Sequence, residues 1–144
     1  MLGKKELRKE MIRSKIDRIV DSVNFIEENL PSEFEDFDNR ILKNAIYKEL
    51  EFAIENIIDI CSIINSDLRL GSPETEDSIV EHLERRKILD KAVLESIKEI
   101  KRFRNILIHK YGEIDDKMAF GSIQDGLKDF SLIIKEIEEF LDKN

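Results

Sequence analysis

The chain has 144 residues, with 41% hydrophobic and 39% charged residues, five glycines and two prolines, which argues against disorder and favours a compact helical protein. Its net charge of -8 argues against a protein that coats nucleic acid non-specifically, because such binding depends on many phosphate contacts. An enzyme that meets RNA locally remains open. We expect a single domain over residues 1–144.

The N-terminal sequence MLGKKELRKEM runs from charges directly into helical periodicity, without the apolar core of a signal peptide. No apolar run reaches the roughly 18 residues of a membrane span, because Asp59 interrupts even the segment IIDICSII. Cys61 is the only cysteine, so a disulfide within the chain is excluded. Its isoleucine neighbours favour a core position over a reactive thiol. We therefore predict a cytoplasmic protein that does not contact a membrane.

Apolar residues recur three or four positions apart in two long segments, which predicts two amphipathic helices. The first covers about residues 5–30 and ends at Pro31, and the second covers about residues 39–68. The second helix carries an additional apolar line that includes Ile54 and Ile58. Two apolar faces predict either a central position in a bundle or burial against another subunit.

The segment GSPET then interrupts the helical pattern. Gly71 is typical of a helix end, and Ser72 before Pro73 is typical of an N-cap followed by proline in the first turn. We expect a short helix over about residues 74–86 and a longer one over about residues 90–109.

Gly112 ends that pattern, and Asp115 or Asp116 is expected to cap a final helix. This helix has an unbroken apolar line with spacings of three and four, typical of a packed seam. Its members are Phe120, Ile123, Leu127, Phe130, Ile134, Ile137 and Leu141. The sequence therefore predicts an all-α, up-and-down bundle of four to five helices.

Most motifs that carry chemistry are missing from the sequence. GSPET lacks the lysine and the preceding strand of a phosphate-binding loop, and the spacing of His and Cys residues fits no metal site. His82 lies among charges in VEHLERR and is expected to be an exposed surface residue. The remaining candidate is RFRNILIHKY, residues 102–111, in a region where five of residues 98–110 are Lys or Arg and only Glu99 is acidic.

Arg104 is the unusual residue of this stretch. At about 100° per residue it falls inside the apolar stripe of its helix, where an arginine is costly unless it is paired. Asn105 and His109 are four residues apart and share a neighbouring face. Two interpretations are open. Either Arg104 snorkels or pairs with an acid of another helix, such as Asp59 or Glu55, or Arg104 and His109 line a cleft that holds a phosphate.

Arg104, His109 and Tyr111 form the pattern R-x4-H-x-Y, and the surrounding FRNILIHKYGEID resembles the signature of the HepT-like branch of the HEPN domains. The segments IENIIDICSII, GSPET and LKDFSLIIKEIEEFL are also similar to that branch. The resemblance covers about residues 39–141.

This resemblance implies a helical bundle that forms a homodimer, with the two motifs meeting in a shared cleft. It implies a metal-independent ribonuclease without a cofactor, acting on RNA (mRNA or tRNA) as the toxin of a toxin–antitoxin pair. The implied partner is an MntA-like nucleotidyltransferase, which neutralises the toxin by transferring AMP to the motif tyrosine, here Tyr111. No metal-binding residue is expected.

The chemistry of the residues agrees with this resemblance. RNA cleavage without a metal needs a base for the ribose 2′-hydroxyl, an acid for the leaving oxygen and a cation for the phosphorane. His109 suits the base or acid role, and the guanidinium fork of Arg104 suits the phosphorane oxygens. Supporting candidates are Asn105, which would orient His109, Tyr111, which would position the substrate, and Asp59, as a partner of Arg104.

The spacing of the two catalytic candidates bears on the architecture. Residues five apart on an ideal helix point about 140° away from each other, so Arg104 and His109 do not converge within one straight helix. Either the helix distorts near Gly112, or a twofold dimer supplies groups from both chains. The second apolar face of residues 39–68 favours the dimer, and we predict an obligate homodimer with a composite site.

Two other functional interpretations remain. In one, a non-catalytic helical dimer binds a nucleotide or a nucleotidyltransferase, and the motif contributes to the partner surface. In the other, the motif is structural: Arg104 forms a buried ion pair and His109 caps its helix.

Overall fold

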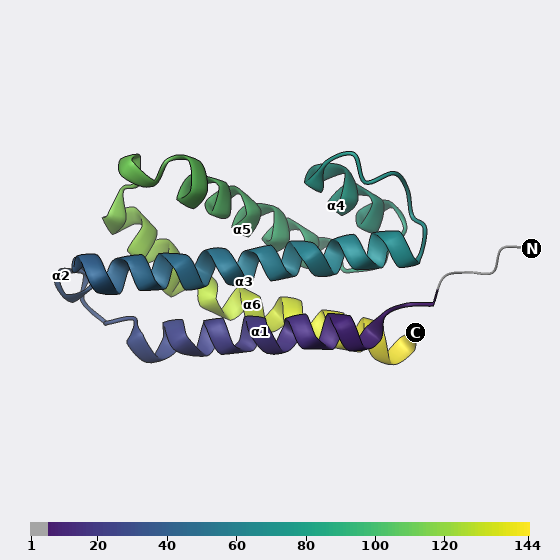
Figure 1. Cartoon of the computed structure of the whole chain (residues 1–144), viewed down its shortest axis with the longest axis horizontal. Coiled ribbons are helices and arrows are strands. Elements are labelled where there is room, and N and C mark those ends of the chain that lie inside the picture. Colours follow the sequence, from purple (N-terminus) through teal and green to yellow (C-terminus); the bar gives the residue numbers. More distant parts are fainter. Residues whose placement is uncertain (1–5) are drawn as a thin grey trace, which may run out of the picture.

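The computed structural model describes residues 6–144, which form helices joined by short loops (Figure 1). In chain order these are α1 (Lys9–Asn29), α2 (Phe34–Phe37), α3 (Arg40–Asp67), α4 (Glu76–Arg85), α5 (Lys91–His109), the 3₁₀ turn η1 (Tyr111–Glu113) and α6 (Asp116–Lys143). α1 packs against α3 and α6, α5 packs against α3 and α6, and α4 packs against α3 and α5. The prediction of an all-α bundle is confirmed, and no strand occurs within residues 6–144.

The core is one continuous cluster of buried apolar side chains to which all four long helices and α4 contribute. α3 lies at its centre and buries Ile54 and Ile58 within the chain. Of the two explanations for its second apolar face, the central position is therefore correct, and this face gives no support to a dimer. Cys61 is also buried, as predicted, and its burial raises the pKa of the thiol to about 12.

The starts of two helices differ from the sequence prediction. α1 begins at Lys9, and the predicted start at residue 5 lies outside the described residues. The short fourth helix begins at Glu76 and not at residue 74, because Thr75, and not Ser72, is its N-cap. The Thr75 hydroxyl accepts a hydrogen bond from the Ser78 N–H, and the Ser78 hydroxyl accepts one from the Thr75 N–H (2.9 and 3.0 Å). At α6, Asp115 is the N-cap, as one of the two predicted alternatives.

His82 is half-buried, so the prediction of an exposed surface residue is wrong. Its Nδ1 lies 2.9 Å from Oδ1 of the buried Asn65 on α3, and Asn65 Nδ2 donates to the carbonyl oxygen of Gly71 (3.0 Å). These bonds attach both α4 and the preceding loop to α3. They explain why a histidine surrounded by charges in the sequence points inward.

Within residues 6–144, no helix combines the length and the apolar character that crossing a membrane requires.

Candidate functional site

The two predicted catalytic residues lie in the last turns of α5. The segment is α-helical through His109 and changes to the 3₁₀ turn η1 only at Tyr111. Because the helix is regular between Arg104 and His109, the offset of about 140° between the two positions persists. The change of geometry near Gly112, one of the two remedies considered for this offset, begins only after His109 and therefore leaves the offset unchanged.

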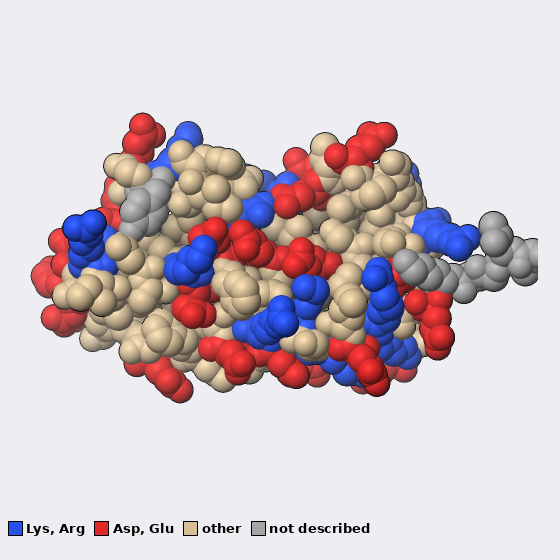
Figure 2. Space-filling view, in the orientation of Figure 1, with Lys and Arg blue, Asp and Glu red and all other residues tan. Residues whose placement is uncertain are grey.

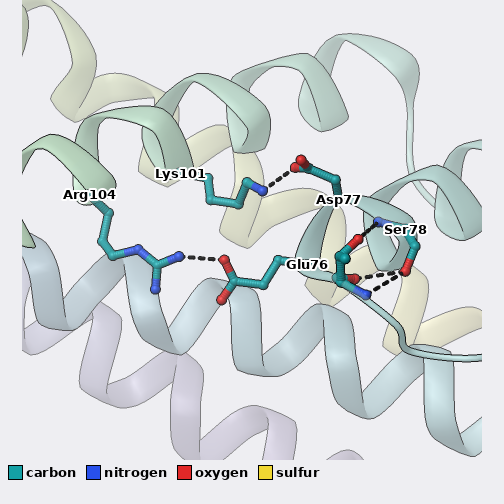
Figure 3. Close-up of polar contacts among 6 residues, drawn as sticks. Glu76, Asp77, Ser78, Lys101 and Arg104 are labelled. Atoms are coloured by element: carbon teal, nitrogen blue, oxygen red, sulfur yellow. Dashed lines mark hydrogen bonds and ion pairs between the residues drawn. The ribbon is translucent and has the colours of Figure 1, made fainter. Parts of the chain in front are cut away.

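Arg104 is held by α4 (Figure 3). Its Nη2 donates to Glu76 Oε1 over 2.5 Å, and only 11% of its side chain is exposed. Its Nε is buried and has no hydrogen-bond partner among the described residues. The expectation that Arg104 pairs with an acid of another helix is confirmed, but the acid is Glu76, on α4.

Asp59, the predicted partner of Arg104, lies elsewhere in the bundle. It projects toward α1, where Lys15 Nζ donates to its Oδ2 over 3.2 Å. The structure thus gives Asp59 a cation on α1 and gives Arg104 a carboxylate on α4. The expectation of a pair between Asp59 and Arg104 is wrong, because the two side chains belong to different faces of the bundle.

A second ion pair lies one turn before Arg104 on α5. Lys101 Nζ pairs with Asp77, the residue that follows Glu76, and Figure 3 shows both pairs side by side. Lys101 is buried, which is unusual for a lysine. Lys101 lies three residues before Arg104 in the sequence. On a helix this spacing places the two side chains on the same face, so it is the sequence signal that could have identified Lys101.

The capping hydrogen bonds of Thr75 and Ser78 fix the first turn of α4, which carries both acids. Glu76 and Asp77 are the first two residues of this helix, where acidic side chains are favoured by the helix dipole. Nothing in a single sequence pairs these acids with α5. Their role at the site was missed for that reason.

His109 is exposed at the C-terminal end of α5, and Asn105 is half-buried one turn before it. Asn105 lines a shallow hollow of about 370 Å³ between α4 and α5. The other residues of the hollow are Asp77, Glu81, Lys98, Lys101 and Arg102. In Figure 2 the outline of the molecule dips between α5 and α4, and both acidic and basic side chains lie there. The hollow beside the motif is therefore a charged groove in which the cations come from α5 and the acids from α4.

The loop after His109 is anchored by α3 and α6. Tyr47 Oη and Lys43 Nζ donate to the two carboxylate oxygens of Asp116, over 2.7 and 2.8 Å. Burial of Asp116 opposes its ionisation, but these two hydrogen bonds and the Lys43 charge outweigh it and lower its pKa. The backbone of Tyr111 opens η1 in this loop, and its side chain lies outside the described part of the structure.

In the described part of the chain, no group of three or more His, Cys, Asp and Glu side chains is arranged to hold a metal ion.

Comparison with known proteins identifies related sequences and folds. The model of the family described as Ribonuclease HepT-like matches residues 19–137. A protein of Archaeoglobus fulgidus that is provisionally assigned as an RNase is 27% identical over 137 residues, 95% of this chain and 98% of the relative. The mRNA nuclease HepT of Shewanella oneidensis is 26% identical over 97 residues, 67% of this chain and 73% of the relative.

Among solved structures, the tri-AMPylated HEPN toxin of Shewanella oneidensis in complex with its MNT antitoxin has the same fold. The TM-score is 0.80 at 24% identity, and the match covers 89% of this chain and 96% of that toxin chain. A toxin–antitoxin structure with AMP-PNP gives a TM-score of 0.82 at 22% identity, covering 90% of this chain and 98% of the other. At these identities the likeness shows the fold alone.

Proposed function

Because the chain belongs to the HepT-like ribonuclease family, we propose that it is an endoribonuclease toxin that cleaves RNA without a metal ion or a cofactor. The observation that carries the proposal is the arrangement on α5. A nearly buried guanidinium, Arg104, is paired with Glu76 at the start of α4, and an exposed imidazole, His109, stands at the end of the same helix as Arg104.

In this proposal, one imidazole takes the proton of a ribose 2′-hydroxyl, and the oxygen attacks the adjacent phosphorus. The bond from phosphorus to the 5′-oxygen then breaks, and a separate group that acts as an acid protonates the leaving oxygen. The products are a 2′,3′-cyclic phosphate and a 5′-hydroxyl. Arg104 stabilises the charge on the phosphorane oxygens, because its planar fork of N–H groups matches them.

The proposed active form is a homodimer with a composite site. α5 is regular, so one chain does not aim Arg104 and His109 at the same atom, whereas a twofold axis near the end of α5 supplies both groups. Ile106 and Ile108, on either side of Leu107 and next to His109, are 43% and 40% exposed, which is apolar surface that a second chain would cover.

The proposal includes regulation by an MntA-like nucleotidyltransferase that transfers AMP to Tyr111. Support comes from the AMPylated toxin and the antitoxin complexes among the structural relatives, and from the place of Tyr111 in the motif. A cytoplasmic location is part of the same proposal, in keeping with the single buried Cys61. Names of the relatives, mRNA nuclease HepT and tRNA nuclease HepT, support RNA as the substrate class.

The proposal is tested by incubating the purified protein with total RNA in EDTA, alongside His109→Ala and the matched variant Glu113→Gln. Glu113 is exposed in the turn just after the motif, so its change leaves the site intact. We expect cleavage by the wild type and Glu113→Gln, and a loss of at least about 100-fold in His109→Ala, the usual contribution of a general acid or base. Equal activity of all three proteins would refute the role of His109, and equal inactivity would favour a non-catalytic dimer.

A further inference from the structure

Two carboxylates from the first turn of α4 occupy two cations on one face of α5. Glu76 holds Arg104, and Asp77 holds Lys101, one turn earlier on α5 (Figure 3). We propose that this turn is an acidic clasp, which closes the phosphate-binding face of α5 in the free protein and opens when RNA binds. The inference rests on the proposed function and adds Lys101 as a second phosphate-binding residue.

Exposure shows which partner in each pair reaches the solvent. The side chains of Arg104 and Lys101 are 11% and 9% exposed, whereas those of Glu76 and Asp77 are 41% and 73% exposed. The cations are therefore covered and the acids form the outer layer. An RNA phosphate reaches Arg104 only when the Glu76 side chain turns away, and the same holds for Lys101 and Asp77.

The closed pair leaves a donor of Arg104 unused. Glu76 accepts from Nη2, while Nε is buried without a partner among the described residues. Nε and Nη2 lie on one edge of the guanidinium and suit an anion that presents two oxygens to both donors. A phosphate that binds this edge satisfies Nε as well, so it forms a hydrogen bond that Glu76 does not make. This difference favours the exchange of the carboxylate for a phosphate.

The clasp opens without detaching α4 from the bundle. The body of the helix is fixed by the contact between His82 and Asn65 and by the buried Leu83, whereas the two acids sit at its solvent-facing start. Rotation of the Glu76 and Asp77 side chains is therefore sufficient to open the clasp. It exposes Lys101 in the hollow that Asn105 also lines, and it exposes Arg104 one turn further along α5 toward His109.

The test measures binding and cleavage separately in Glu76→Gln/Asp77→Asn. Binding uses a fluorescent single-stranded RNA with 2′-O-methyl groups, which is resistant to 2′-hydroxyl attack, and cleavage uses the same sequence with free 2′-hydroxyls in EDTA. We expect the double variant to bind the RNA more tightly, by up to about fivefold for each ion pair that no longer has to break. Single-turnover cleavage at low RNA concentration rises in parallel.

The matched control is Glu51→Gln/Asp142→Asn. Glu51 pairs with Lys48 (3.5 Å) and Asp142 pairs with Arg13 (4.0 Å), outside α4 and α5, so the control also removes two negative charges and two ion pairs but leaves the clasp and the hollow intact. A third variant, Lys101→Met, is expected to weaken binding and to reduce the slope of log K against log salt by about 0.7, the value for one phosphate contact on a single strand. Thermal unfolding of each variant checks that the fold is retained.

The outcomes separate the clasp from the proposed function. Tighter binding in the clasp variant than in the control, with no cleavage by any protein, would support the clasp and refute the nuclease. Cleavage by the wild type, with the clasp variant equal to its control or weaker, would refute the clasp and leave the nuclease standing. An unchanged salt slope in Lys101→Met would refute the phosphate contact, and a lack of RNA binding by all proteins would refute both proposals.

Discussion

Gly71 shows how a single residue without a side chain helps to anchor α4. A Cβ atom built on Gly71 would lie 2.6 Å from the His82 ring, which is closer than real contacts allow. The ring is held there by Asn65, whose amide also donates to the carbonyl oxygen of Gly71. The loop, the helix and α3 are therefore packed around this position, and glycine is the residue that fits.

Gly71→Ala is expected to displace the His82 ring and to weaken its hydrogen bond with Asn65. We predict a loss of about 1–3 kcal/mol in the free energy of unfolding, the range for leaving a buried polar group unsatisfied. Urea denaturation at pH 7 measures it. The matched control is Gly121→Ala in α6, where a Cβ meets nothing within 4 Å in the described structure. This control should stabilise the protein by about 0.5–1 kcal/mol, and equal effects of the two changes would contradict the account.

At the scale of elements, the start of α6 is fixed by a carboxylate from its first residue. Asp116 accepts hydrogen bonds from Tyr47 and Lys43 of α3, and Lys43 also lies 3.6 Å from Asp38. These contacts attach α6 to α3 directly after η1. They therefore hold the loop that carries Tyr111 close to the end of α5.

The lowered pKa of Asp116 makes this contribution to stability depend on pH. A carboxyl whose pKa is lower in the folded than in the unfolded state stabilises the fold above its ordinary value of 3.8, and the effect disappears as the pH falls through the folded value. We predict that Asp116→Asn costs about 1–2 kcal/mol at pH 7, and that the difference from the wild type shrinks below pH 4. Urea denaturation between pH 3 and pH 7 measures this.

Asp125→Asn provides the comparison, because Asp125 is an exposed acid on the same helix. It should change the stability by less than about 0.5 kcal/mol at any of these pH values. A loss in Asp116→Asn that persisted unchanged in acid would show that the Asp116 charge is not the source of the effect.

The helices were predictable because each one follows from the spacing of apolar residues within its own segment of the sequence. Apolar spacing gave α1, α3, α5 and α6 to within a few residues, and the stripe of α5 identified Arg104 as an anomaly. The start of α4 was missed, because Ser72 and Thr75 are equally good caps in sequence and only Thr75 finds a reciprocal partner in Ser78. The inward orientation of the His82 side chain was not predicted, because its partner Asn65 is 17 residues away in the sequence.

The candidate site was predictable in part. Arg104, Asn105 and His109 were identified from the motif, and their catalytic and supporting roles stay predictions, as does that of Tyr111. Glu76, Asp77 and Lys101 were not identified, because an ion pair between helices depends on their relative rotation, which apolar spacing does not fix. The prediction of Asp59 as the partner of Arg104 failed on that point.

At the scale of the whole molecule, the central question is how Arg104 and His109 meet. The proposed homodimer predicts that a heterodimer of one Arg104→Ala chain and one His109→Ala chain retains one intact composite site. We expect such a heterodimer, purified by two different tags, to recover roughly half of the wild-type activity, whereas each mutant homodimer is inactive. A heterodimer as inactive as the homodimers would mean that each chain supplies its own site. A wild-type monomer in sedimentation at micromolar concentration would exclude the composite site.

The chemical nature of the RNA ends tests the central claim most directly. Attack by the 2′-hydroxyl, with Arg104 and His109 as the catalytic groups, yields a 2′,3′-cyclic phosphate and a 5′-hydroxyl. Mass spectrometry of the fragments formed in EDTA should therefore detect these two ends, and a single 2′-O-methyl group at the cleaved nucleotide should prevent cleavage there. Fragments with 5′-phosphate and 3′-hydroxyl ends, or cleavage that appears only when a divalent metal is added, would contradict the account.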